Sequence, residues 1–532
     1  MNTQKSPIIS SFKKYQPIIL AVILFLLSLY IYLHKYYWPG SPDERRYLAW
    51  AFNIYKFGEY TRLSGDPMVE VPALFCVLIS FSYKICGISL SSAQLTSIFF
   101  SALLSPLAFF MGKTFYNEKV GIISGIFTAT SVLIWEYSAR VLSEPELTFF
   151  INLSILFLYF TLKKGTKKYA FLLGVFLGLS FWFKELAAFF VPVVVLILIE
   201  KKFDVKTRIR NFFICGITGA GVIAPWYYYV YSATQKVQGD ITERRVVQAV
   251  STTWWGVRSL QEMISMATFL RTLSVLVLIL FYIGVIAAVH RYSKQKHLSD
   301  KLLVVTIGVW FTLFVFNTFM SISVRRFIPM LLPLYILSSK GLMDFYNRMK
   351  KVEVAVEKTK PALFIFIIFL FSFWNLRIGH YGTFNYFSLV QENPLDDPLE
   401  IQFREDCQYF STQYPTDEVV GSLLAHMFYF YTGGAYETRW LGREELSQIA
   451  SKDILCQMSP NFGVSKKGLL EQILNEDITV LVLFSSQKAI PLIGYLRSHP
   501  DIFTETTNTE YKVTVVFEIN KEELEEYFAS LA

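Results

Sequence analysis

The sequence lacks the short motifs that identify soluble nucleotide-binding and metal-binding proteins. Its 532 residues show no internal repeat, no P-loop and no GxGxxG fingerprint. The five cysteines form no CxxC pair, and the six histidines are scattered without ligand spacing, so we assign no residue to a metal site. Cys407 and Cys456 would pair as a disulfide if their domain lies outside the cell, and free thiols are the alternative.

Charged residues are also scarce, at 17% of the chain against 53% hydrophobic residues, with a mean hydropathy of +0.40. Long apolar runs recur from Ile18 to Trp374, which predicts a polytopic α-helical membrane protein. No small-residue cleavage site follows the first run, so it is not a cleaved signal peptide. Much of the net charge of +8 lies in short loops, where it indicates orientation rather than binding to nucleic acid.

Loop charge sets the predicted topology. Three lysines precede the first span and four lie in the KKGTKK loop at 163–168, so both segments should be cytoplasmic. Alternation then requires 71–88 to be an interfacial helix rather than a span. The run 169–199 is too long for one span and has basic residues at both ends, which predicts a hairpin with Lys184 and Glu185 at its outer tip. About eleven spans result, at 18–33, 93–112, 120–135, 147–162, 169–199 (two), 212–231, 266–289, 302–322, 327–342 and 363–374.

The composition changes after Arg377. Residues 379–532 are polar, with strand-like runs at 419–424, 478–484 and 513–519 and a helical pattern at 469–474. We therefore predict two domains, a transmembrane domain at 1–378 and a small external α/β domain at 379–532. The transmembrane domain would carry its first external loop at 35–92.

That first external loop contains an unusual charged sequence, PDERRY. Pro42 should start a short amphipathic helix that places Asp43 and Glu44 near its first turn, beside Arg46 and Tyr47. Charged groups at a membrane boundary are costly to desolvate and tend to mark function. An ordinary charged cap on a loop is the alternative interpretation.

The predicted topology gathers the other unusual charged residues on the same external side. They are Arg140, Glu144, Glu146, Lys184, Arg325 and Arg326. Together with the first loop they could hold a lipid-linked phosphate while a carboxylate accepts a hydroxyl proton. Each has a simpler interpretation as well: the two arginines as a helix cap, Lys184 as a snorkelling side chain and Glu146 as a helix N-terminal charge.

The pattern DE-x-R-Y at 43–47 resembles the first external loop of the GT-C membrane glycosyltransferases, above all the aminoarabinose transferases and protein O-mannosyltransferases. ARVLSEPELTFF at 139–150 is similar to a second acidic motif that opens a membrane helix, and RRFIPMLLPLYIL at 325–337 resembles a late R-F-x-x-P segment. The likeness extends over roughly residues 15–345. Val71 stands where aminoarabinose transferases have a lysine before the proline, which leaves the acceptor open.

The resemblance implies a GT-C fold and inverting sugar transfer from a polyprenyl-phosphate-linked sugar to a lipid, glycan or protein acceptor at the outer face of the cell membrane. Asp43 would be the catalytic base, with Glu44 and Glu144 as further catalytic carboxylates. Donor phosphate would bind Arg46, Lys184, Arg325 and Arg326, while Tyr47, Arg140 and Glu146 would face the acceptor or the interface. No cofactor is certain, and a divalent cation is possible. A transporter or flippase and a non-catalytic glycan-assembly protein are the alternatives.

Overall fold

The computed structural model is mostly helical, with a small sheet domain near the C-terminus. The predicted span 363–374 and most of the predicted loop 232–265 lie outside the residues that the structure describes. The described residues are 7–35, 42–63, 65–236, 275–295, 297–316, 324–351, 398–422, 424–441, 444–445, 454–457, 462–484, 489–507, 511 and 514–531.

The chain divides into two compact units. The helical unit comprises Met1–Tyr37, Val69–Leu78 and Ser91–Pro394. The α/β unit comprises Trp38–Met68, Ile79–Leu90 and Leu395–Ala532. The segment predicted as the first external loop is therefore shared between the units, and its charged helix groups with the C-terminal residues.

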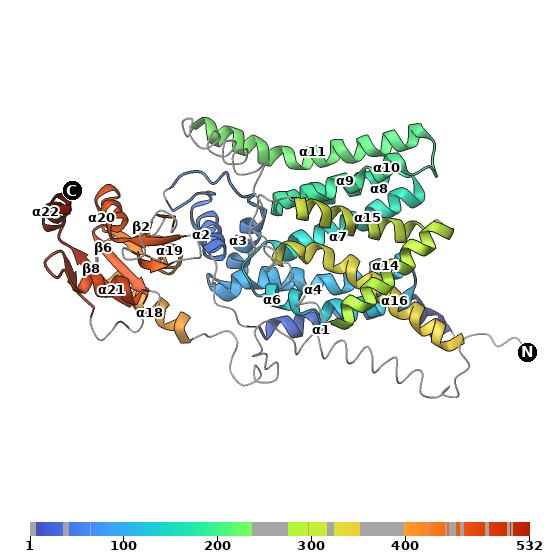
Figure 1. Ribbon diagram of the computed structural model, residues 1–532, viewed down its shortest axis with the longest axis horizontal. Helices are drawn as coiled ribbons and strands as arrows, with labels where there is room; N and C mark the ends of the chain where they lie inside the picture. The colour runs from blue at the N-terminus through green and yellow to red at the C-terminus, as the bar shows by residue number, and fades with distance from the viewer. Residues whose placement is uncertain are drawn as a thin grey trace, which may run out of the picture. The chain divides into compact units, whose positions relative to one another are not determined.

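The helical unit consists of long apolar helices that run roughly parallel (Figure 1). Neighbours in contact include α7 with α8, α8 with α11, α14 with α16, and α5 with both α1 and α16. Its elements are α1 (Pro7–Leu33), α4 (Leu90–Phe115), α5 (Glu118–Ala129), α6 (Val132–Ser138), α7 (Glu144–Lys164), α8 (Lys167–Phe183), η1 (Glu185–Phe190), α9 (Val191–Val194), α10 (Leu196–Ile199), α11 (Val205–Lys236), α14 (Val275–Gln295), α15 (Leu298–Phe316), η2 (Val324–Met330) and α16 (Leu331–Lys351).

Among the described residues, four helices are long and apolar enough to cross a membrane, at Tyr15–Leu33, Leu90–Phe115, Glu144–Lys164 and Val205–Ala233. The predicted span 120–135 is not one straight helix: α5 and α6 meet at an angle of 49°, and together they would make a fifth span. Thr130 and Ser131 form the break, where the Ser131 hydroxyl caps α6. Eleven spans are not confirmed. The helix α3 (Leu74–Cys86) has 13 residues, too few to span, as the interfacial prediction requires.

The predicted hairpin at 169–199 is confirmed by contacts at both of its ends. α8 ends at Lys184, whose backbone is extended, and η1 begins at the next residue. Lys184 contacts Glu144 at the start of α7, whereas Lys202, which follows α10, donates a hydrogen bond to the Lys163 carbonyl oxygen near the end of α7. The chain therefore runs along α7, returns along α8, reverses at Lys184 and comes back through η1, α9 and α10.

Small residues allow the helices of this unit to approach closely. Gly174 on α8 faces α11, and a Cβ at this position would lie 2.5 Å from the Cys215 carbonyl oxygen. Gly121 on α5 would likewise place a Cβ 2.6 Å from the Phe109 carbonyl oxygen of α4. Membrane helices associate through such contacts because lipid is as apolar as their side chains, so close van der Waals packing supplies the attraction.

The α/β unit contains a five-stranded sheet of order β2-β1-β6-β8-β7 and a three-stranded antiparallel sheet of order β3-β5-β4. β1 pairs in parallel with β2 and β6, and β8 is antiparallel to β6 and β7. The strands are β1 (Val419–Ser422), β2 (Glu437–Trp440), β3 (Glu444–Glu445), β4 (Ile454–Gln457), β5 (Phe462–Ser465), β6 (Val480–Phe484), β7 (Phe503–Glu505) and β8 (Thr514–Ile519). The three predicted strands correspond to β1, β6 and β8, so those predictions are confirmed.

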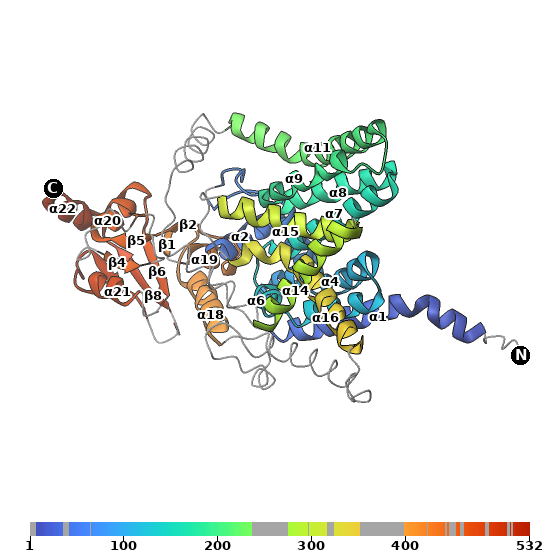
Figure 2. The same ribbon diagram turned by 45° about the vertical axis from the view of Figure 1, so that its right-hand side comes forward.

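Among the described residues, five helices complete the C-terminal part of this unit: α18 (Pro398–Gln413), α19 (Ala425–Tyr431), α20 (Lys466–Asn475), α21 (Ile490–Arg497) and α22 (Lys521–Leu531). Figure 2 shows α20 and α21 beside the strands. Leu470, Leu492 and Leu524 from the last three helices join Leu481 and Phe517 of the sheet in one buried apolar cluster. Cys407 on α18 is a buried free thiol, which is the second of the two alternatives that the sequence left open for it.

The charged helix α2 (Pro42–Phe57) packs against α19 of the same unit. The Tyr429 hydroxyl donates a 2.9 Å hydrogen bond to the Asn53 side-chain oxygen, and the Phe52 ring lies edge-on to the rings of Tyr429 and Phe430. Lys56 donates to the Gly433 carbonyl oxygen. A segment near the N-terminus is thus part of the C-terminal fold, a relationship that no local pattern in the sequence predicts.

Candidate active site

The centre of the candidate site in the helical unit is the carboxylate of Glu144. Its side chain is 1% exposed, and its Oε1 accepts a 2.6 Å hydrogen bond from Lys184 Nζ. Arg325 Nε lies 3.4 Å from the same oxygen. A buried charge is stable only when it is paired, so the two cations explain how Glu144 can be buried. Three of the residues that the sequence singled out therefore meet in space.

Each member of this cluster stands where a regular helix starts or stops. Glu144 is the first residue of α7, Lys184 follows the last residue of α8, and Arg325 lies in the 3₁₀ helix η2. Helix ends leave backbone groups that polar side chains and ligands can satisfy. The placement at the ends of α7 and α8 keeps the charges away from the middle of these helices, as the predicted topology requires.

Two hydrogen bonds fix η2 against the helices. Asn152, on the third turn of α7, donates a 2.9 Å hydrogen bond to the Pro329 carbonyl oxygen. Trp310 Nε1 on α15 donates to the Arg326 carbonyl oxygen at 3.2 Å. The backbone that carries Arg325 and Arg326 is therefore held from α7 and α15.

A second ion cluster lies on α6 and was missed as a site from the sequence. Glu136 accepts 2.7 Å hydrogen bonds from both Lys35 and Arg140. The Lys35 ammonium also lies 3.9 Å from the centre of the Trp135 ring. Of these residues only Arg140 was a candidate, and it pairs with Glu136 rather than with Glu144. The sequence signal that could have revealed this cluster is Lys35, a cation that stands just after the first apolar run.

Glu146 differs from Glu144 in forming no ion pair with the described residues. It lies in the first turn of α7 and is fully buried. Within the described part of the chain, neither of its carboxylate oxygens has a side-chain hydrogen-bond partner. Glu146 thus occupies the helix N-terminal position of the simpler interpretation, but its side chain is buried there.

In the α/β unit, α2 begins at Pro42, and Asp43 and Glu44 occupy its first turn as predicted. The two carboxylates have different environments: the Asp43 side chain is 43% exposed and lies 3.9 Å from Arg46, whereas Glu44 is completely buried. Tyr47 is buried and stacks edge-on against Trp50. Adjacent residues on a helix point about 100° apart, which explains the difference between the two acids.

The described residues contain no group of three or more His, Cys, Asp or Glu side chains that could hold a metal ion. Glu144 is neutralised by Lys184 and Arg325, which is not the donor set of a cation site. The described residues therefore do not supply a ligand set for the divalent cation that the sequence left open, and we derive no step through one.

Comparisons with known proteins match part of the chain. The family model described as dolichyl-phosphate-mannose-protein mannosyltransferase matches residues 70–229, the segment that holds Arg140, Glu144, Glu146 and Lys184. The undecaprenyl phosphate-alpha-4-amino-4-deoxy-L-arabinose arabinosyl transferase of Pseudomonas paraeruginosa is 25% identical over 161 residues, 29% of each chain. A Pseudomonas fluorescens protein of the same description is 24% identical over 205 residues, 36% of each chain. The matched segments thus span about a third of these relatives or less.

Solved structures extend the likeness to the whole fold. ArnT from Cupriavidus metallidurans bound to undecaprenyl phosphate superposes with a TM-score of 0.60 at 11% identity, covering 94% of this chain and 97% of that one. The archaeal oligosaccharyltransferase AglB from Archaeoglobus fulgidus, in complex with an inhibitory peptide and a dolichol-phosphate, gives 0.58 at 11% identity, covering 89% and 70%.

The fold and the buried ion cluster thus define a multi-pass membrane protein with an ArnT-like architecture. Its resemblance to the GT-C glycosyltransferases, and among them to the aminoarabinose transferases and protein O-mannosyltransferases, is confirmed.

Proposed function

We propose that the protein is a glycosyltransferase that moves a sugar from a polyprenyl-phosphate donor to a lipid, glycan or protein acceptor, with inversion. The observation that carries the proposal is the buried Glu144–Lys184–Arg325 cluster within an ArnT-like fold. Two cations around one carboxylate leave one positive charge in excess, and Arg326 adds another. Such a group suits the phosphate of a lipid donor.

In the proposed reaction, Asp43 accepts the proton of the acceptor hydroxyl as its oxygen attacks the anomeric carbon. The bond between that carbon and the phosphate oxygen breaks, and polyprenyl phosphate leaves with the electron pair. A phosphate leaving group needs little protonation, so one base suffices, in contrast to the carboxylate pair of glycosidases. Asp43 is assigned as the base because it is the more accessible of the two adjacent acids.

Lys184, Arg325, Arg326 and Arg46 are assigned to the donor phosphate, whose negative charge grows as the bond breaks. Glu144 holds Lys184 and Arg325 in place by ion pairing. Arg140, Glu146 and Tyr47 are assigned to the acceptor side or the membrane interface, and Glu44 to a supporting role beside Asp43.

The proposal includes the predicted orientation. The N-terminus would be cytoplasmic, residues 1–378 would form the transferase domain in the cell membrane, and residues 379–532 would lie outside. A transporter would instead place its charges in mid-membrane, whereas Glu144 and Lys184 stand at the ends of α7 and α8.

The function is tested by mass spectrometry of cell-surface glycans and glycolipids from cells with and without the gene. We expect one sugar to disappear from one class of acceptor when the gene is absent, and the same loss in cells that carry only Asp43→Asn. Unchanged glycans in the absence of the gene would contradict the proposed activity. If cells that carry only Asp43→Asn still make the normal glycans, the result would favour a non-catalytic assembly protein.

A further inference from the structure

A basic cavity lies at the opposite end of α7 from Glu144. Its volume is about 910 Å³, and its lining comes from the end of α7, the segment after α10, the end of α14 and the start of α15. Lys163 stands nineteen residues after Glu144 on α7, which is about 28 Å along a helix axis. The cavity is therefore separate from the candidate active site within the same unit.

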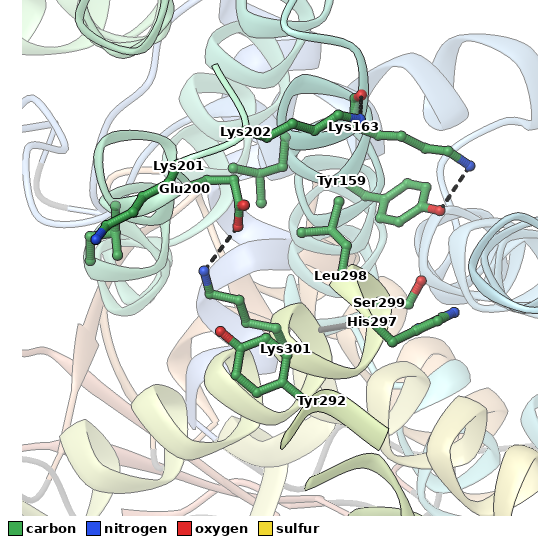
Figure 3. A pocket seen from close by; sticks show the side chains of 12 residues that line it. Tyr159, Lys163, Glu200, Lys201, Lys202, Tyr292, His297, Leu298, Ser299 and Lys301 are labelled. Atoms are coloured by element: carbon green, nitrogen blue, oxygen red, sulfur yellow. Dashed lines mark hydrogen bonds and ion pairs between the residues drawn. The ribbon is translucent and has the colours of Figure 1, made fainter. Parts of the chain in front are cut away.

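The lining carries a strong excess of positive charge. Lys163, Lys201, Lys202 and Lys301 face a single acid, Glu200, which leaves three formal positive charges in excess when His297 is neutral. Figure 3 shows Lys202 and Lys163 on one side and the Glu200–Lys301 pair on the other. The start of α15 adds the partial positive charge of a helix N-terminus.

These lysines keep hydrogen-bonding capacity. Each ammonium has three N–H donors. Lys163 uses one on the Tyr159 hydroxyl at 3.1 Å, Lys202 uses one on the Lys163 carbonyl oxygen at 2.6 Å, and Lys301 uses one on Glu200 at 2.9 Å. The remaining donors suit the oxygens of a phosphate group.

Apolar residues in the same lining decide between sources of phosphate. Leu162, Ile199 and Leu298 line the cavity beside the lysines, and Ile199 is 56% exposed. A soluble phosphate would leave this apolar surface in contact with water, whereas a lipid would cover it with acyl chains while its headgroup meets the lysines. Basic pockets between membrane helices bind anionic lipid headgroups in this way.

We propose that this cavity binds the phosphate headgroup of an anionic glycerophospholipid. By the loop-charge topology this lipid belongs to the cytoplasmic leaflet. The proposal does not depend on the transferase activity, because none of the lining residues belongs to the candidate active site.

The test uses the full-length protein purified in a neutral detergent with phosphatidylcholine. Phosphatidylglycerol or inorganic phosphate is then added, and bound lipid is counted by native mass spectrometry alongside thermal unfolding. We expect retention of phosphatidylglycerol and a higher unfolding temperature. Equal protection by inorganic phosphate would assign the cavity to a soluble phosphate compound. No retention of phosphatidylglycerol would show that the cavity does not bind the lipid. Either result overturns the proposal.

The decisive variant is Lys163→Gln with Lys202→Gln, and its control is Lys164→Gln with Lys168→Gln. The control removes the same charge from exposed lysines at the same end of α7 and α8, outside the cavity lining. We expect at least about tenfold weaker retention of phosphatidylglycerol in the first pair, since charge-assisted hydrogen bonds are lost, and little change in the control. Equal losses in both pairs would mean general attraction to a basic surface and would contradict a built site. Retention by Asp43→Asn, a variant that should stay folded, distinguishes this result from any failure of the proposed transfer reaction.

Discussion

Lys184 donates a 2.6 Å hydrogen bond to Glu144 across forty residues of sequence, and this contact joins the tip of one helical hairpin to the start of the preceding helix. Both residues lie at the same end of α7 and α8 because those helices are antiparallel and joined by a short turn at Gly165 and Thr166. Gly165, at φ 66°, closes α7 in the left-handed conformation that glycine adopts readily. The turn geometry therefore determines which charges meet.

Glu144→Gln should destabilise the protein, because it leaves Lys184 and Arg325 without their shared carboxylate. Breaking a buried ion pair from one side costs about 3–5 kcal/mol. Glu118→Gln is the matched control, since Glu118 is 39% exposed and pairs with Lys113 at 3.8 Å. An exposed pair contributes about 0–1 kcal/mol. Thermal unfolding of both variants compares them directly, and equal stability would show that the Glu144 pair contributes little.

Asp43→Asn should leave a folded, membrane-inserted protein that retains polyprenyl phosphate and scarcely transfers sugar. Loss of a general base typically lowers the rate by about 10²–10⁴-fold. Glu44→Gln should slow transfer less per folded molecule, although burial of Glu44 makes this variant the less stable of the two. Transfer assays on purified, monodisperse protein provide the comparison. A near wild-type rate for Asp43→Asn would leave Asp43 as a structural cap.

The orientation of the hairpin can be measured with introduced cysteines. Glu185 and Thr166 are both exposed in the structure, one at the tip after α8 and the other in the turn before it. In a Cys86→Ser, Cys456→Ser background, whose remaining cysteines are all buried in the described part of the chain, a membrane-impermeant maleimide added outside cells should label Glu185→Cys and leave Thr166→Cys unlabelled. The reverse pattern would invert the proposed topology and place the charged cluster on the cytoplasmic side.

Gly174→Leu should weaken the packing of α8 on α11, because even a Cβ would lie 2.5 Å from the Cys215 carbonyl oxygen. Overpacking of this kind costs about 1–3 kcal/mol. Gly216→Leu is the control, since it adds the same side chain to α11 where no atom lies within 4 Å of the new Cβ. A lower unfolding temperature for Gly174→Leu alone is the expected outcome, and matching temperatures would argue against close packing here.

The sequence by itself determined the features that depend on local composition. Apolar runs identified α4, α7 and α11 as span-length helices, and alternating patterns located β1, β6 and β8. Basic loops at 163–168 and 201–210, with a charged pair between them, were enough to predict the reversal at Lys184. These predictions succeeded because helix length, strand alternation and loop charge are properties of contiguous residues. The count of eleven spans is not confirmed: among the described residues four helices are long and apolar enough to span, and α5 with α6, which meet at 49°, would make a fifth.

Only the tertiary structure decided which charges are paired. Glu144 binds Lys184 and Arg325, while Glu136 binds Arg140 and Lys35. This distribution depends on how η2 and α6 pack against α7. The attachment of α2 through Asn53 to Tyr429 likewise joins residues separated by 376 positions. Such contacts form between side chains that are distant in the sequence, and their energies depend on burial and on helix-end geometry, which no local pattern encodes.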